Sequence, residues 1–90
     1  MGKADLPQDI EQLYALLSGI TDPETMKNLL EDLCTRKEIA NMAERIRAAK
    51  LLMEGKTYTQ VIEQTEISSA TLSRVSRCVQ CGKGYSELLK

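Results

Sequence analysis

The sequence predicts an all-α protein of about six helices that contains a helix-turn-helix. Apolar residues recur at steps of three and four along most of the chain, and no alternating strand pattern competes with them. The 90 residues include three Tyr but no Phe or Trp, and 42% are hydrophobic. Aliphatic and Met side chains must therefore fill the interior, as they do in helical bundles. Gly, Pro and hydroxyl residues divide the chain into helical pieces.

The first third of the chain predicts two helices. Apolar side chains in residues 6–20 keep helical spacing, and Gly19 is a plausible stop. The segment 21–24 has the form of a capping box in which Thr21 caps a helix that runs to about Leu33. The apolar stripes are broader than packing on one neighbour requires, and 90 residues make a small core. We therefore expect a second copy of the chain to cover part of them.

A long central helix should follow. Thr35 opens a second segment with the form of a capping box, and Gly55 marks the end of the helix. Its apolar positions follow steps of three and four: Ile39, Met42, Ile46, Ala49 and Met53. We expect one domain in four parts: dimerisation helices in residues 1–34, the central helix in 35–56, the helix-turn-helix in 57–79 and a C-terminal helix in 80–90.

Two short helices joined by a tight turn predict the helix-turn-helix. The first should span Thr57 to about Thr65, and the second should begin near Ser69 and end near Val79. The apolar positions expected to hold the pair together are Val61, Ile62, Ile67, Leu72 and Val75. The opposite face of the second helix is then free to meet a ligand.

Hydroxyl and cationic side chains crowd that free face. They are Ser68, Ser69, Thr71, Ser73, Arg74, Ser76 and Arg77. Small hydroxyl residues permit close approach to a major groove and can bond phosphates or base edges, while the methyl groups of Ala70 and Thr71 can touch thymine. Arg74 and Arg77 add positive charge that can reach the DNA backbone or guanine. This surface predicts a binding site for double-stranded DNA.

The distribution of charge agrees with that site, although the formal net charge is only −1. Residues 1–33 carry two Lys against seven Asp and Glu, a net charge of −5. Residues 67–90 carry four Lys and Arg against one Glu, a net charge of +3. We expect the C-terminal end to face phosphate and the N-terminal end to avoid it.

Other classes of function have little support in the sequence. The chain has no His and no Gly-rich phosphate loop, so we expect neither an enzyme nor a cofactor. Cys78 and Cys81 have the spacing of half a zinc site, but Cys34 is the only other thiol, so no metal is expected. A redox pair at these two residues is conceivable. Three cysteines and the lack of a membrane-spanning run predict a cytoplasmic protein.

Several separated motifs resemble the Trp repressor family, in particular its YerC/YecD branch. They are residues 33–38 (LCTRKE), 45–47 (RIR), 51–55 (LLMEG), 70–74 (ATLSR), 73–78 (SRVSRC) and 82–85 (GKGY). The resemblance implies an intertwined homodimer that represses transcription by placing two reading helices in successive major grooves of a palindromic operator. The residues that it places on DNA are Ser69, Ala70, Thr71 and Ser73, with Thr59 and Gln60 as weaker candidates.

The resemblance also implies a ligand pocket, and here the sequence departs from the family. Thr35, Arg45 and Arg74 match residues that contact tryptophan in Trp repressors. Val75, however, stands where those proteins carry glycine beside the indole, so tryptophan is not expected as a co-repressor and any small-molecule effector is unknown. Glu66 occupies a turn position where glycine is common. If residue 66 is left-handed, a residue other than glycine at this position costs about 1 kcal/mol. The alternative is that the preceding helix ends in a different way, which avoids a left-handed residue.

One alternative function comes from another class. The chain could be a helical protein-interaction module whose acidic N-terminal half binds a partner, with the helix-turn-helix serving only as a scaffold.

Overall fold

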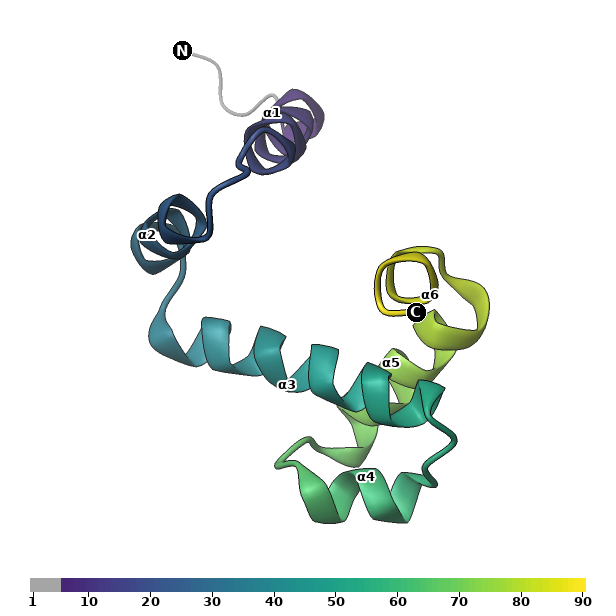
Figure 1. Ribbon diagram of the computed structural model, residues 1–90. Coiled ribbons are helices and arrows are strands. Elements are labelled where there is room, and N and C mark those ends of the chain that lie inside the picture. The colour runs from purple at the N-terminus through teal and green to yellow at the C-terminus, as the bar shows by residue number, and fades with distance from the viewer. Residues whose placement is uncertain (1–5) are drawn as a thin grey trace. The chain divides into compact units, whose positions relative to one another are not determined.

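A computed structural model of the chain describes residues 6–90, and all the regular secondary structure in that range is α-helical (Figure 1). They are α1 (Leu6–Ser18), α2 (Pro23–Leu33), α3 (Arg36–Met53), α4 (Tyr58–Gln64), α5 (Ser69–Cys81) and α6 (Gly84–Leu88). The chain divides into two compact units, one ending at Thr35 and the other running from Arg36 to Lys90. The all-α class and the helix-turn-helix predicted from the sequence are confirmed. Between residues 6 and 90, no helix is both long and apolar enough to cross a membrane.

The N-terminal unit consists of α1 and α2, and its second helix is capped differently from the prediction. The Asp22 carboxylate accepts hydrogen bonds from the backbone N–H of Thr25 at 2.9 Å and from its hydroxyl at 2.9 Å. These bonds lower the pKa of the Asp22 carboxyl. The prediction that Thr21 caps this helix is wrong because the helix begins at Pro23, which makes Asp22 the residue directly before the first turn.

Apolar side chains in the N-terminal unit are poorly covered within one chain. Neither α1 nor α2 contains a buried residue. Leu6 is 59% exposed, Leu16 55% and Leu33 54%. These helices therefore have an apolar surface but no core of their own.

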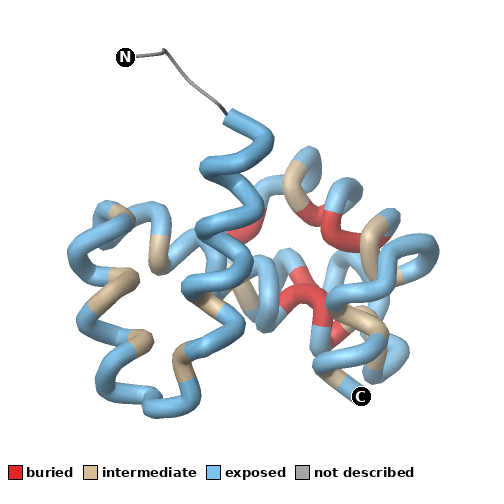
Figure 2. The backbone as a smooth tube through the Cα atoms, turned by 90° about the horizontal axis from the view of Figure 1, so that it is seen from above, coloured by how far each residue is buried: buried red, intermediate tan, exposed pale blue. Residues whose placement is uncertain are grey.

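The C-terminal unit holds the core of the described chain. Its buried apolar residues are Ala48, Ala49 and Leu51 of α3, Val61 of α4, Ile67 of the turn, and Leu72 and Val75 of α5. Figure 2 shows these buried segments in red. Tyr85 and Leu89 of the C-terminal segment pack against this core while remaining partly accessible. The core thus joins α3 to both helices of the helix-turn-helix.

The predicted apolar stripe of α3 is buried only in part. Met42 is 37% exposed and Ile46 44%, whereas Ala48 and Ala49 are fully buried. The prediction fails for Met42 and Ile46 because the packing of α4 and α5 on α3 buries only Ala48, Ala49 and Leu51 of this helix.

The end of α3 is fixed by Gly55, as the sequence predicts. Gly55 has a φ of 94° and donates its N–H to the carbonyl of Leu52 at 3.0 Å. The N–H of Lys56 reaches back to the carbonyl of Leu51 at 3.1 Å. These two bonds form a Schellman motif, which satisfies carbonyls at the helix end and turns the chain toward α4.

Replacing Gly55 by Ala should lower the free energy of unfolding by about 1 kcal/mol, because a side chain is strained at positive φ. Chemical denaturation at a fixed protein concentration measures this change. Gly84→Ala is the matched control, since a Cβ at Gly84 meets nothing within 4 Å and its φ is not positive. Equal stability of the two variants would contradict the assigned role of Gly55.

Candidate nucleic-acid interface

The turn between α4 and α5 is held by the side chain of Thr65. Its hydroxyl donates to the carbonyl of Val61 at 2.8 Å and accepts from the N–H of Ile67 at 3.3 Å. Thr65 itself has an extended backbone, with φ −134° and ψ 178°. Ile67 then inserts into the core, where it is 6% exposed. The turn therefore ends α4 and anchors the start of α5 through one hydroxyl and one apolar side chain.

Glu66 stands in this turn without backbone strain. Among residues 6–90 no residue other than glycine has a positive φ. The alternative considered from the sequence, that the preceding helix ends differently, is therefore the correct one. The role of Thr65 was not predicted from the sequence, although Glu66 in place of glycine was the signal that another residue must shape the turn.

Ser68 begins the predicted reading helix. Ser68 is the N-cap of α5, and its hydroxyl oxygen accepts a hydrogen bond from the backbone N–H of Thr71 at 3.2 Å. The same hydroxyl donates to the Thr71 hydroxyl at 3.0 Å. This cap leaves the N–H groups of the first turn at the exposed end of α5, where a helix attracts phosphate.

The two sides of α5 differ sharply in exposure. Leu72 and Val75 are buried on the inner side, at 0% and 2% exposure. The outer side presents most of the predicted DNA contacts in exposed positions: Ser68, Ser69, Ala70, Ser73, Arg74 and Arg77. Thr71 is half-buried beside the cap. The helix therefore offers hydroxyls, one small apolar residue and two guanidinium groups on a single surface.

Ser76 does not belong to that outer surface. It is 7% exposed, because it lies one helical turn after Leu72 on the inner side of α5. Its inclusion among the exposed hydroxyl residues was wrong.

The weaker candidates lie on α4. Thr59 and Gln60 are both exposed. The Gln60 side-chain oxygen accepts from the N–H of Thr57 at 2.8 Å, and the Thr57 hydroxyl accepts from the N–H of Gln60 at 3.2 Å. Gln60 thus completes a capping box at the start of α4. Ile62, predicted to lock the helix pair, is 41% exposed, so Val61 alone provides the buried contact from this short helix.

A polar cavity of about 410 Å³ lies beside the turn, between α3 and the start of α5. It is lined by Lys37, Asn41, Glu44, Arg45, Glu66, Ile67, Ser68 and Thr71. Arg45 is the one residue of the expected ligand pocket on this lining. Arg74 is exposed on α5, and Thr35 belongs to the N-terminal unit. The cavity places cations, carboxylates and hydroxyls together, which suits a small polar molecule rather than an apolar ring.

Comparison with known proteins agrees with this architecture. Residues 8–90 match the family described as Trp repressor protein. The uncharacterized protein YerC of Bacillus subtilis (strain 168) is 36% identical over 81 residues, which cover 90% of this chain and 78% of YerC.

Two solved structures are also similar. A TrpR-like protein from Eubacterium eligens ATCC 27750 aligns with a TM-score of 0.83 and 36% identity, covering 90% of this chain and 84% of that one. A chain from Staphylococcus aureus, described as a proposed Trp repressor, aligns with a TM-score of 0.83 and 27% identity. The alignment covers 97% of this chain and 92% of that one. On the match of residues 8–90 and the identity with YerC, the chain belongs to the Trp repressor family, in its YerC-like branch.

Proposed function

We propose that the protein is a transcriptional repressor that binds double-stranded DNA as a homodimer through α5. The observation that carries the proposal is the outer surface of α5, where exposed Ser69, Ala70 and Ser73 lie between an N-terminal cap and two exposed Arg residues. A major groove accepts such a helix, and hydroxyl groups and methyl groups can read base edges there. Membership of a family of regulators supports the same conclusion and gives no support to an enzymatic role.

The N-terminal unit supports the homodimer. Its Leu6, Leu16 and Leu33 each keep more than half of their surface exposed within one chain. A second copy that covers these side chains removes them from water, at about 25 cal/mol for each Å² of apolar area. Two copies related by a two-fold axis present two α5 helices, which reach successive major grooves if they lie about 34 Å apart.

Selection of bound fragments from random DNA tests the function directly. The proposal expects one enriched, roughly palindromic sequence, and affinity that falls as salt concentration rises. The rival function, a protein-interaction module without DNA binding, expects no enriched sequence at any salt concentration. Repeating the selection with candidate metabolites shows whether a small-molecule effector changes DNA binding.

Replacing Ser73 by Ala should weaken binding to the enriched sequence by about 1 kcal/mol, because one hydrogen bond to DNA is lost. Competition between the enriched fragment and a scrambled fragment measures the lost preference. Gln80→Ala is the control, since Gln80 is exposed on α5 beyond the proposed contacts. Thermal unfolding should not change in either variant. An unaltered preference in Ser73→Ala would remove this residue from the interface.

Replacing Arg77 by Ala should weaken binding to every sequence and make the salt dependence shallower by about 0.9 per subunit, as loss of one phosphate contact requires. Binding isotherms at several salt concentrations give the slope. Lys27→Ala removes the same charge from the acidic N-terminal part of the chain, and its slope should equal that of the wild type. A wild-type slope in Arg77→Ala would reject the phosphate contact.

Tryptophan should show no stoichiometric binding to the protein. Val75, at the position where Trp repressors carry glycine, is 2% exposed and packs within the chain's own core. Its branched side chain occupies space that an indole would need. Isothermal calorimetry with the purified protein checks this, and a one-to-one site for tryptophan would refute it.

A further inference from the structure

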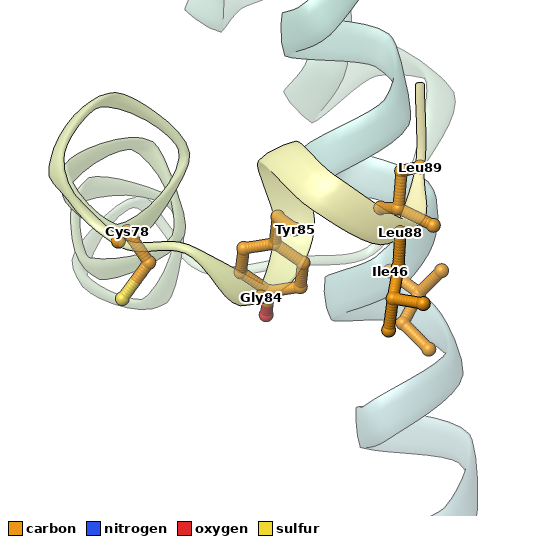
Figure 3. A pocket seen from close by; sticks show the side chains of 7 residues that line it. Ile46, Cys78, Gly84, Tyr85, Leu88 and Leu89 are labelled. Atoms are coloured by element: carbon orange, nitrogen blue, oxygen red, sulfur yellow. The ribbon is translucent and has the colours of Figure 1, made fainter.

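Two cavities of the C-terminal unit border opposite ends of α5, and they differ in chemistry. At the C-terminal end lies an apolar cavity whose lining includes Ile46, Cys78 and Tyr85 but no charged side chain (Figure 3). At the N-terminal end, Ser68 and Thr71 line the polar cavity together with charged residues. Charged groups therefore gather at the end of α5 whose first residues are proposed to read bases.

One side of α3 changes from polar to apolar along its length. Positions 37, 41, 44 and 48 are separated by steps of four, three and four, so they lie on one face of the helix. Ala48, at the later end of this row, is fully buried in the core. Lys37, Asn41 and Glu44, at the earlier end, line the polar cavity. Arg45, the residue after Glu44, lines it as well. The first half of α3 thus presents polar side chains toward the start of α5.

The cations of this cavity are not neutralised within the described chain. Lys37 and Arg45 are exposed, and within residues 6–90 neither side chain forms a hydrogen bond or an ion pair. Glu66 is exposed as well, whereas Glu44 is half-buried. The charged side chains that are exposed at the cavity are therefore two cations and one carboxylate, a net charge of +1.

This charged group adjoins the surface proposed to meet DNA. Ser68 and Thr71 belong both to the cavity lining and to the predicted DNA contacts. The Thr71 oxygen accepts a hydrogen bond from the Ser68 hydroxyl at 3.0 Å, which leaves the Thr71 hydroxyl hydrogen available to another acceptor. A major groove is about 12 Å wide, so a helix that enters it has phosphates on both sides. The strand on the cavity side of α5 then passes the first half of α3.

We infer that Lys37 and Arg45 of α3 bind a backbone phosphate of that strand, and that Glu66 opposes the same contact. The inference rests on the proposed function, because it extends the DNA surface from α5 to α3. Each cation that meets the phosphate releases counterions from DNA, while the carboxylate repels the phosphate. A phosphate contact does not read bases, so it strengthens binding to every sequence and fixes the register of α5 on the duplex.

Binding isotherms of the 90-residue chain at several salt concentrations test the contact from the protein side. Lys37→Ala should bind the enriched and the scrambled fragment about two- to fivefold more weakly, which is the effect of one exposed ion pair. Its salt dependence should be shallower by about 0.9 per subunit. Lys50→Ala is the matched control, because Lys50 is an exposed residue of α3 that does not line the cavity. The slope of this control should equal that of the wild type.

The carboxylate gives a test of opposite sign. Glu66→Gln removes the negative charge and keeps the shape of the side chain, so it should bind both fragments about two- to fivefold more tightly. Thermal unfolding of Lys37→Ala and Glu66→Gln should match that of the wild type. A wild-type slope in Lys37→Ala, or a Glu66→Gln chain that binds no more tightly than the wild type, would overturn the inference.

Ethylation of single phosphates in the enriched fragment tests the contact from the DNA side. Because ethylation removes the charge of a phosphate, it should weaken wild-type binding at one or more phosphates in each half-site to which Lys37→Ala is insensitive. Equal sensitivity of both chains at every phosphate would show that Lys37 binds none. A wild-type chain that selects no DNA sequence would remove the proposed function together with this contact. Selective wild-type binding without any effect of Lys37→Ala would remove the contact alone.

Discussion

The C-terminal unit depends on the packing of the inner side of α5 against α3 and α4. Leu72 and Val75 meet this layer from α5 and Val61 from α4, and all three are nearly or fully buried. Each such side chain contributes about 1.5–3 kcal/mol when removed from water. The α3 positions in the same core include Ala48 and Ala49, whose small side chains let a neighbouring helix come close. Burial of one side of α5 is what leaves its hydroxyl and cationic side in solvent.

The turn before α5 shows how one hydroxyl can replace a glycine. Where a left-handed residue would make the corner, Thr65 bonds both the carbonyl of Val61 and the N–H of Ile67, and its own backbone remains extended. Glu66 is then accommodated without positive φ. The start of α5 is thus positioned by side-chain hydrogen bonding and by the buried Ile67, which fixes the direction in which α5 leaves the turn.

Local signals predicted much of the fold. Capping residues and glycines act over three or four positions, so the ends of α3 and the start of α5 could be found from the sequence. Inward and outward faces were harder to assign. In the seven-residue α4, periodicity could not separate Val61 from its neighbour Ile62, which is exposed. Ser76 was misplaced because its chemistry resembles that of the exposed hydroxyl residues, while its helical position is on the inner side.

Long-range burial could not be predicted from one chain. Met42 and Ile46 keep the spacing of a core stripe, yet they are exposed because burial of α3 within its own unit begins only at Ala48. The same holds for the apolar side chains of α1 and α2. Their spacing indicates burial, but local periodicity does not tell what covers these side chains. For the candidate site, the sequence indicated the outer surface of α5, whereas only Arg45 of the expected ligand pocket lines the polar cavity beside it.

The proposed function requires two copies of α5 to face successive major grooves of one DNA duplex. Hydroxyl-radical footprinting of the 90-residue chain on its selected fragment measures this arrangement. We predict two protected segments related by two-fold symmetry, with centres about 34 Å apart along the duplex. A single protected segment, or no protection at protein concentrations that saturate binding, would contradict it.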